Sequence, residues 1–584
     1  MRRPSFSADW GDYVSFAKHL RDRADADGSD LLLVDTGDRI EGNAIYDSSK
    51  PRGKFTYEIA KEQTIDLICS GNHELYKAES ANGEFYHTVP DFKGNYLASN
   101  LDIINPKTGQ RQPLAARYKK FKTKNQGIRI LAFGFIFDFT GNDNNTFVIP
   151  VEETVKQDWF TDAIKDKDVD LILVYGHVDI RSTEYALLHK TIRSAQWDTP
   201  IQFFGGHSHI RDYKIFDAAS VALESGRYME TIGFMSIDGL RTSTSTSTST
   251  SATKPSPAEE DKKNKKKLKF SRRYIDNNIF SMHHHTSTNT STFGTLHGLI
   301  VSNSIHIARK SLGLGTQYGC APQNYWVSRR PYPHPESIFT LLATRVLPEA
   351  ISPPEKDKKA LVITNTGGIR FDIFKGPFTK DTKFLVSPFT SGIRYIEDVP
   401  YAAARKLLPL LNNEGPILEA MAMGKKARFL GAPEQRAARL RPDMYRGGDA
   451  VWGGGHGGAA QRGGGEKQKP LQSGRTEGDI FPGYTTRDDA GDDGDDTLHE
   501  VIPFYQVPNC VQAAVGFEQG GETEPDVVHV MFNEFMLKWV LLGLEYLGEK
   551  YSAEDTRVYE GGKSFTDILT GWVEEHWGGE GECS

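Results

Sequence analysis

Short runs of consecutive apolar residues alternate with amphipathic stretches through the first 240 residues of the chain. Apolar side chains recur at the spacing of one helix face at Tyr13, Phe16, Ala17 and Leu20, which predicts a helix there. Five apolar runs that read as buried strands follow at residues 31–34, 65–69, 128–137, 170–174 and 201–204. Continuous apolar strands separated by helices are typical of a layered α/β fold.

Four of these runs lead directly into polar residues that can bind a metal ion. They are followed by Asp-Thr-Gly-Asp ending at Asp38, Gly-Asn-His-Glu at 71–74, Gly-His ending at His177, and Gly-His-Ser-His at 206–209. Each motif alone is often only a turn, but the carboxyl ends of strands in open α/β sheets are where sites assemble. One Asp, one Asn and three His in this order indicate a divalent ion of the Zn²⁺, Mn²⁺, Fe or Co²⁺ class.

Two stretches of the chain lack hydrophobic periodicity. Residues 241–269 begin with alternating Thr and Ser and end in a lysine-rich run, and residues 425–478 are rich in Gly, Arg and Gln. Such composition cannot bury a core, which explains an apolar share of only 38 % in 584 residues. We therefore expect one domain at 1–240, a low-complexity linker at 241–269, and a second domain at 270–584 with a disordered insertion at about 425–478.

Charge, hydropathy and cysteine content exclude several classes of protein. A net charge of −7 argues against a general nucleic-acid-binding protein. The mean hydropathy of −0.49 argues against a polytopic membrane protein. The late apolar run at 527–547 contains charged residues and reads as a packed helix, so no integral membrane segment is expected. The four cysteines lie far apart without a Cys-x-x-Cys motif, which excludes a zinc finger and leaves one or two disulfides open.

The ordered set of motifs resembles the calcineurin-like metallophosphoesterases, whose pattern is Asp-x-His, Gly-Asp, Gly-Asn-His-Glu/Asp, an isolated His and Gly-His-x-His. The resemblance implies an αββα sandwich with two divalent metal ions bridged by Asp38. The ligands of one ion would be Asn72, His177 and His207, and His209 would help to hold the other. His73 would contact a phosphoryl oxygen or protonate the leaving group.

The first motif of this family, Asp-x-His, has no counterpart ahead of Asp38. The family places it at the end of a strand just before the first predicted helix, so we expect it to lie upstream of Met1. Asp9, Asp12 and His19 are the only local substitutes. The alternative function is a catalytically impaired binding protein that retains the fold.

The second half of the chain has its own set of motifs. A predicted strand at 361–364 leads into Asn-Thr-Gly-Gly-Ile-Arg at 365–370, and Gly-Pro-Phe-Thr and Ser-Pro-Phe follow. Arg370 can contact phosphate or ribose oxygens, Asn365 a polar edge of the base or sugar, and Phe389 the face of a nucleobase. These motifs resemble the carboxy-terminal domain of 5′-nucleotidases.

Two departures from the family pattern bear on the site. Well-known 5′-nucleotidases have an Asp at the position of Tyr76, where it pairs with the catalytic His, so His73 must be oriented in another way. Residues 494–497 are the nearest match to the segment that supplies a second stacking aromatic, and they end without one. The pattern is closest to a fungal branch of the 5′-nucleotidases, in which a segment like Met-His-His-His at 282–285 recurs. That segment reads as a polar interdomain stretch, with metal binding as the alternative.

Together these features predict a metal-dependent phosphoester hydrolase, a 5′-nucleotidase-like phosphatase that uses water activated by two metal ions. Its substrate would be a nucleotide or a related phosphomonoester, with no nucleic-acid partner, and its oligomeric state is left open. A protein phosphatase with the same metal core is disfavoured because such proteins lack the second domain. The resemblance favours a secretory or vacuolar location, with the cytosol as the alternative.

Overall fold

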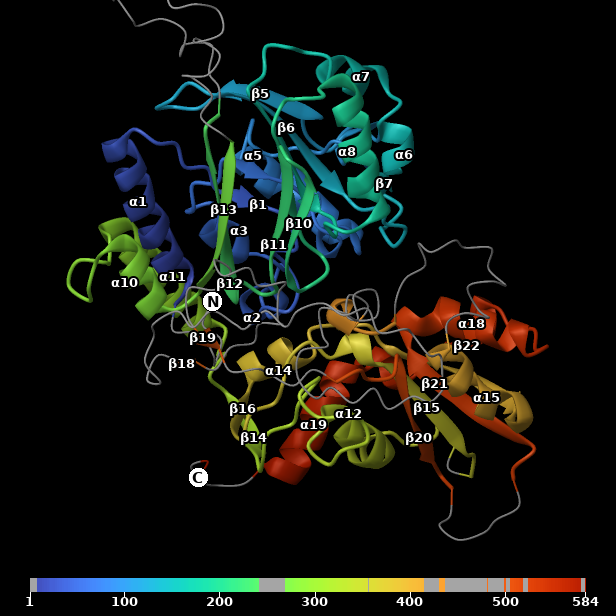
Figure 1. Ribbon diagram of the computed structural model, residues 1–584. Helices are drawn as coiled ribbons and strands as arrows, with labels where there is room; N and C mark the ends of the chain where they lie inside the picture. The colour runs from blue at the N-terminus through green and yellow to red at the C-terminus, as the bar shows by residue number, and fades with distance from the viewer. Residues whose placement is uncertain are drawn as a thin grey trace, which may run out of the picture. The chain divides into compact units, whose positions relative to one another are not determined.

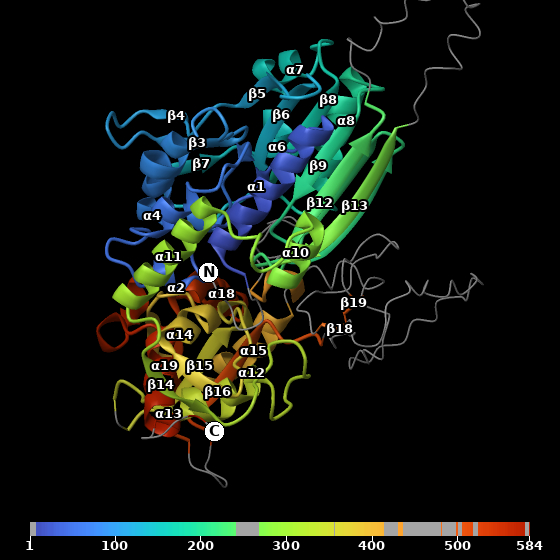
Figure 2. The same ribbon diagram turned by 90° about the vertical axis from the view of Figure 1, so that its left-hand side faces the viewer.

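The computed structural model describes residues 8–240, 268–355, 357–413, 430–435, 480–481, 498–499, 505–517, 524–578 and 583 (Figures 1 and 2). The chain forms two compact units, each with its own sheets and core. Unit 1 contains the described residues of Met1–Arg39, Tyr57–Ile305 and Gly453–Ile502, and unit 2 those of Ile40–Thr56, His306–Trp452 and Pro503–Ser584. Residues 241–267 lie outside the described residues, as does the predicted insertion at 425–478 apart from 430–435.

Unit 1 is built on a six-stranded sheet in the order β10-β11-β9-β8-β6-β5. In chain order its strands are β5 (Tyr118–Lys122), β6 (Arg129–Ile136), β8 (Leu171–His177), β9 (Ile201–Gly205), β10 (Arg211–Asp217) and β11 (Ser220–Ser225). The inner pairs β6–β8, β8–β9 and β9–β11 are parallel. Three predicted strands are confirmed as β6, β8 and β9, whose side chains are nearly all buried because both faces of the sheet are covered.

Helices and a small second sheet cover the two faces of this sheet. On one face lie α6 (Val151–Thr154), α7 (Asp158–Ala163) and α8 (Thr183–Ala195), and their apolar side chains share one core with the sheet (Figure 1). Leu67 and Cys69 pack against Tyr175 on the opposite face. They belong to the segment of β2 (Leu67–Ile68), which pairs in parallel with β1 (Val34–Asp35). Both strands are shorter than the runs predicted at 31–34 and 65–69.

The predicted first helix is confirmed as α1 (Trp10–Asp27), which begins with a capping box. The side chain of Asp9 accepts hydrogen bonds from the backbone N–H groups of Gly11 and Asp12, and Asp12 accepts one from Asp9. The smaller elements of unit 1 include η1 (His73–Leu75), α4 (Ala78–Gly83), η2 (Glu84–Thr88), α5 (Val89–Asp91), β3 (Leu101–Ile104), β4 (Arg111–Pro113) and β7 (Thr146–Val148).

The two compact units divide the chain differently from the expected boundary at 241–269. Strand β12 (Thr231–Asp238) pairs in antiparallel register with β13 (Lys269–Asp276) along its whole length. Helix α10 (Ile279–Thr286) then packs on α1, where Met282 and Phe16 share a buried cluster, and α11 (Leu296–Ser311) follows. The low-complexity segment is therefore an insertion between two paired strands of unit 1, since the chain returns to the same unit after it.

Unit 2 is built on a five-stranded sheet in the order β20-β15-β21-β17-β22. In chain order the strands are β15 (Ala360–Asn365), β17 (Ile393–Pro400), β20 (Cys510–Val515), β21 (Val527–Asn533) and β22 (Thr556–Val558). One face packs on α15 (Tyr401–Asn412) and α18 (Leu537–Tyr546), and the other on α12 (Ile338–Leu341), α13 (Leu347–Ala350) and α19 (Phe565–Trp577). The remaining elements include α2 (Ala44–Asp47), β14 (Gln317–Ala321), β16 (Gly376–Thr379) and α14 (Lys380–Val386).

The late apolar run at 527–547 is divided between two elements of unit 2. The interpretation of the whole run as a packed helix is wrong for its first half, which forms the buried central strand β21. Its second half forms helix α18, as predicted. No helix within the described residues combines the length and the apolar character needed to span a bilayer.

One disulfide is present among the described cysteines. It joins Cys320 of β14 to Cys583, which follows α19, across 263 residues of sequence. Cys69 and Cys510 are buried and free. The bond therefore ties the end of the described chain to a strand that precedes the central sheet of unit 2.

Reduction of this disulfide is expected to destabilise unit 2. A cross-link across a long loop restricts the unfolded chain, and its loss usually lowers the free energy of unfolding by about 2–5 kcal/mol. Urea unfolding of the full chain with and without reductant measures the effect. The double variant Cys320→Ser/Cys583→Ser is the control, because reductant should not shift its midpoint further. Four free thiols in the denatured, unreduced protein would contradict the assignment.

Candidate functional site

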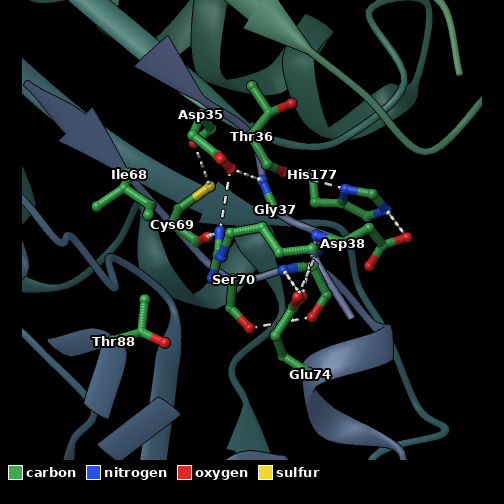
Figure 3. Close-up of polar contacts among 12 residues, drawn as sticks. Asp35, Thr36, Gly37, Asp38, Ile68, Cys69, Ser70, Glu74, Thr88 and His177 are labelled. Atoms are coloured by element: carbon green, nitrogen blue, oxygen red, sulfur yellow. Dashed lines mark hydrogen bonds and ion pairs between the residues drawn. The ribbon is translucent and has the colours of Figure 1, made fainter. Parts of the chain in front are cut away.

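Three predicted metal ligands converge in unit 1. Asp38 follows β1, His177 ends β8 and His207 follows β9. The Nε2 atom of His177 lies 2.9 Å from Oδ2 of Asp38 (Figure 3) and 3.3 Å from Nδ1 of His207. One ligand atom from each residue lies within 4.8 Å of the other two. One carboxylate and two imidazoles therefore meet at a spacing that a single divalent ion can bridge.

The backbone at these ligands adopts conformations that are uncommon for residues with a side chain. Asp38, His207 and His209 have φ values of 62°, 76° and 64°. Non-glycine residues in this left-handed region are strained, and such residues cluster at functional sites. Gly71 comes so close to Asp38 that a Cβ atom there would overlap the Asp38 carboxylate. The motif glycine thus lets the loop after β2 approach the loop after β1.

Glu74 links these two loops through its carboxylate. Its Oε2 atom accepts hydrogen bonds from the backbone N–H groups of Asp38, at 3.0 Å, and Gly71, at 2.7 Å (Figure 3). Its Oε1 atom accepts one from the backbone of Arg39 at 2.7 Å. Burial raises the pKa of Glu74, although the positive charge of Arg39 opposes the shift. The last residue of the Gly-Asn-His-Glu motif therefore has a structural role, because its hydrogen bonds connect the two loops.

A partly buried network of ion pairs lies beside the hydrogen bonds of Glu74. The guanidinium of Arg39 donates to Asp35 at 3.0 Å, to the carbonyl of Cys69 at 2.8 Å and to Glu84 at 2.6 Å. Glu84 also accepts from the hydroxyl of Tyr96 at 2.8 Å. Sequence reasoning did not identify Arg39 or Glu84. Arg39 directly follows the Gly-Asp motif, which is a usable sign, but no motif marks Glu84.

The side chain of Asn72 fits the role of a metal ligand. Its Nδ2 atom donates to the hydroxyl of Tyr76 at 3.1 Å. Its Oδ1 atom is buried and has no hydrogen-bond partner among the described residues. A buried amide oxygen without a partner carries an energetic penalty unless something else binds it. Together with the converging carboxylate and imidazoles, this oxygen makes the described residues suitable for a divalent ion.

His73 and His209 lie differently with respect to the ligand cluster. The backbone N–H of His73 donates to Oδ1 of Asp38 at 3.0 Å. The Nε2 atom of the His73 ring lies 3.8 Å from Oδ2 of Asp38. Burial opposes ionisation of Asp38, but His177 and His73 outweigh it and hold the pKa of Asp38 well below its usual range. His209 is not part of the cluster of ligand atoms found among the described residues, and its ring meets Tyr228 with centroids 5.3 Å apart.

The local substitutes for the first motif have structural roles. Asp9 and Asp12 form the capping box of α1, and Asp9 also accepts from the hydroxyl of Ser302. His19 bonds the carbonyl of Phe293 at 2.7 Å through its Nε2 atom. The three histidines at 283–285 lie on α10, and none of them belongs to the cluster found among the described residues.

Asn365 and Phe389, two of the three predicted nucleoside-binding residues, line one small pocket of unit 2. It is lined by Thr364, Asn365, Gly368, Ile369, Ser387, Phe389, Ser391, Asn533 and Phe565. Arg370 lies against Phe389, with its guanidinium carbon 5.0 Å from the ring centroid. Residues 494–497, the nearest match to the segment that supplies a second stacking aromatic, lie outside the described residues. The pocket has a second aromatic in Phe565, which the motifs did not indicate.

A relay of two amides fixes the polar part of this pocket. The Nδ2 atom of Asn365 donates to the carbonyl of Leu430 at 2.9 Å, and its Oδ1 accepts from Nδ2 of Asn533 at 2.7 Å. A carbonyl can only accept, so the bond to Leu430 sets the orientation of both amides. Both ends of Asn365 are thus engaged, whereas Oδ1 of Asn533 is buried without a partner among the described residues. Asn533 lines the pocket, and the sequence motifs did not indicate it.

Comparisons with known proteins agree with this architecture. Residues 7–211 match the calcineurin-like phosphoesterase family, and residues 324–541 match the C-terminal domain of NAD nucleotidases. A secreted protein of Arthroderma benhamiae is 35 % identical, and the match covers 99 % of this chain and 88 % of that protein. An uncharacterized protein of Schizosaccharomyces pombe is also 35 % identical, with 99 % and 89 % covered.

Solved structures show the same relationship. A 5′-nucleotidase from Candida albicans matches with a TM-score of 0.80 and 35 % identity, over 98 % of this chain and 95 % of that one. A 5′-nucleotidase precursor from Thermus thermophilus shares the fold, with a TM-score of 0.51 and 13 % identity over 98 % and 91 % of the two chains. The chain belongs to the calcineurin-like metallophosphoesterases of the 5′-nucleotidase family.

Proposed function

We propose that this phosphoester hydrolase cleaves nucleotides or related phosphomonoesters with two divalent metal ions, one of them held by Asp38, Asn72, His177 and His207. The observation that carries the proposal is the convergence of Asp38, His177 and His207 within 4.8 Å. The buried oxygen of Asn72 supports it, because this acceptor has no partner among the described residues. His209 would serve the second ion, with Asp38 as the shared ligand.

The ions would supply positive charge at the phosphoryl group and a water of lowered pKa. The chain's own residues position the reaction. Glu74 holds the two ligand loops together through three backbone N–H groups. His73, whose backbone is bonded to Asp38, offers its imidazole to a phosphoryl oxygen or to the leaving group.

In unit 2, we assign recognition of the nucleoside part to the pocket lined by Phe389, Phe565 and Asn533. The two aromatic rings offer flat apolar surface for a base. Asn533 offers a hydrogen-bond acceptor that no described residue uses. Arg370, which lies against Phe389, would contact a phosphate or ribose oxygen.

We further propose that the protein follows the secretory route. Disulfides persist in oxidising compartments and are rare in the cytosol, and Cys320 and Cys583 form one. The name of the Arthroderma benhamiae relative, a secreted protein, agrees with this location.

Removal of a ligand of the proposed first ion is expected to abolish hydrolysis. Asp38→Asn and His207→Ala should each lower kcat/KM for AMP by more than about 100-fold, since loss of residues that only support metal ligands already costs about 10–100-fold. Phosphate release in the presence of Mn²⁺ measures the effect, and EDTA should suppress it. His284→Ala, an exposed histidine of α10, is the matched control and should retain activity.

Two outcomes would contradict this proposal. Hydrolysis that survives Asp38→Asn or EDTA would show that Asp38 and the metal ions are not required. Binding of AMP without any phosphate release would instead favour a binding protein that retains the fold.

Truncation of Phe389 is expected to separate recognition of the base from hydrolysis. Base–aromatic stacking contributes about 1–3 kcal/mol per base, so Phe389→Ala should raise KM for AMP about 10-fold. The KM for glycerol phosphate, which has no base, should stay the same. Tyr546→Ala, an exposed aromatic of α18, is the control. Equal changes for both substrates would assign Phe389 a purely structural role.

A further inference from the structure

Tyr76 occupies a distinctive place beside the candidate metal ligands. It follows η1 (His73–Leu75), directly after the Gly-Asn-His-Glu motif. Its hydroxyl accepts a hydrogen bond from Nδ2 of Asn72 at 3.1 Å. Its ring stands edge-on to the ring of His73, with centroids 5.2 Å apart and an interplanar angle of 87°. One side chain therefore contacts both a proposed metal ligand and the proposed proton donor.

Aromatic packing fixes the position of Tyr76. Its ring packs edge-on against the ring of Phe139, with centroids 5.3 Å apart. The ring of Phe139 in turn packs against that of Phe137, with centroids 5.4 Å apart. Phe137 stacks on His207, with centroids 4.2 Å apart and an interplanar angle of 25°. The segment after β6 thus supports His207 directly and His73 through Tyr76. Because Phe139 packs against the Tyr76 ring, the hydroxyl oxygen has a fixed position from which it accepts the hydrogen bond of Asn72.

The bond to Tyr76 determines what the other end of the Asn72 amide can do. When Nδ2 donates to the phenol, Oδ1 lies at the opposite end of the planar amide, and it has no partner among the described residues. Donation from Nδ2 also increases the negative charge on Oδ1, because the two ends share one conjugated system. Groups that bond the far side of a metal ligand fix its orientation and raise its affinity for the ion.

We propose that Tyr76 is a positioning residue that orients the Asn72 amide toward the metal ion through its hydroxyl and supports the His73 imidazole through its ring. This inference rests on the proposed function, which makes Asn72 a metal ligand and His73 a proton donor. The hydroxyl and the ring have separate tasks, so removing them one at a time should have separate effects.

The first experiment removes only the hydroxyl. Tyr76→Phe keeps the ring in its packing and should weaken binding of Mn²⁺ to the full chain by about 10-fold, as measured by calorimetry. At saturating Mn²⁺ its kcat should stay near that of the unmodified chain. Tyr76→Leu also removes the ring and should lower kcat at saturating Mn²⁺. Tyr118→Phe, an exposed tyrosine of β5, is the matched control and should change neither quantity.

A double-mutant cycle tests whether Tyr76 acts through Asn72. Asn72→Ala removes the amide, so adding Tyr76→Phe to it should weaken Mn²⁺ binding no further. If the two losses add, the hydroxyl does not act through Asn72 and the inference is overturned. Thermal unfolding of each variant without metal shows whether the fold is intact.

The outcomes separate this inference from the proposed function. If the unmodified chain does not bind Mn²⁺, or if Asn72→Ala binds it equally well, the proposed ligand set fails and the inference fails with it. If Asn72→Ala weakens binding but Tyr76→Phe does not, the ligand set stands and the role of Tyr76 is overturned. A fall in affinity for Tyr76→Phe that disappears in the Asn72→Ala background supports the inference.

Discussion

The hydrogen bonds of the Glu74 carboxylate are the interactions on which the edge of unit 1 that carries the candidate metal ligands depends. Strands β1 and β2 pair over only two residues each, so strand register alone cannot fix the loops that follow them. Glu74 bonds the backbone of both loops and brings Asp38 and Gly71 together. Burial disfavours its charged form and raises its pKa, and three N–H donors with Arg39 close by oppose this effect. This rigid link also holds Asp38 in its left-handed conformation, which costs about 1–3 kcal/mol on its own.

The sequence was most informative where a strand is buried on both faces. Strands β6, β8 and β9 could be predicted because burial on both faces demands continuous apolar residues. The same logic placed His177 and His207 at the carboxyl ends of neighbouring parallel strands, where the structure brings them to 3.3 Å. Asp38 joins them because β1 ends at the same edge. The ligand cluster was thus predictable from motif order, since each motif terminates a strand.

Long-range pairing and side-chain partnership could not be predicted in the same way. Strand β13 pairs with β12, although residues 241–267 separate them in the sequence. The partly polar sequence of β13 does not indicate which strand it pairs with. Four cysteines allowed several pairings, and only the fold brings Cys320 to Cys583. Glu84 lies 45 residues from Arg39, and its role depends on burial beside that guanidinium. The Asn533 amide likewise gains its role only because β21 lies next to β15, which carries Asn365.

Asn72 and Asn533 illustrate how one chemical device recurs in the two units. Each amide is held through its Nδ2 atom, by the Tyr76 hydroxyl in unit 1 and by the Asn365 carbonyl oxygen in unit 2. Each leaves a buried Oδ1 atom without a partner among the described residues. An amide has two ends of nearly equal shape, so a bond at one end is the simplest way to define what the other presents. The proposed ligands differ between the sites, because a cation binds only the oxygen of an amide, whereas the edge of a base can offer a donor or an acceptor. At Asn72 the Tyr76 hydroxyl holds Nδ2, and the proposed cation would bind the oxygen at the opposite end of the amide. At Asn533 the orientation of the amide is set within the protein. The carbonyl of Leu430 fixes the amide of Asn365, which in turn fixes that of Asn533.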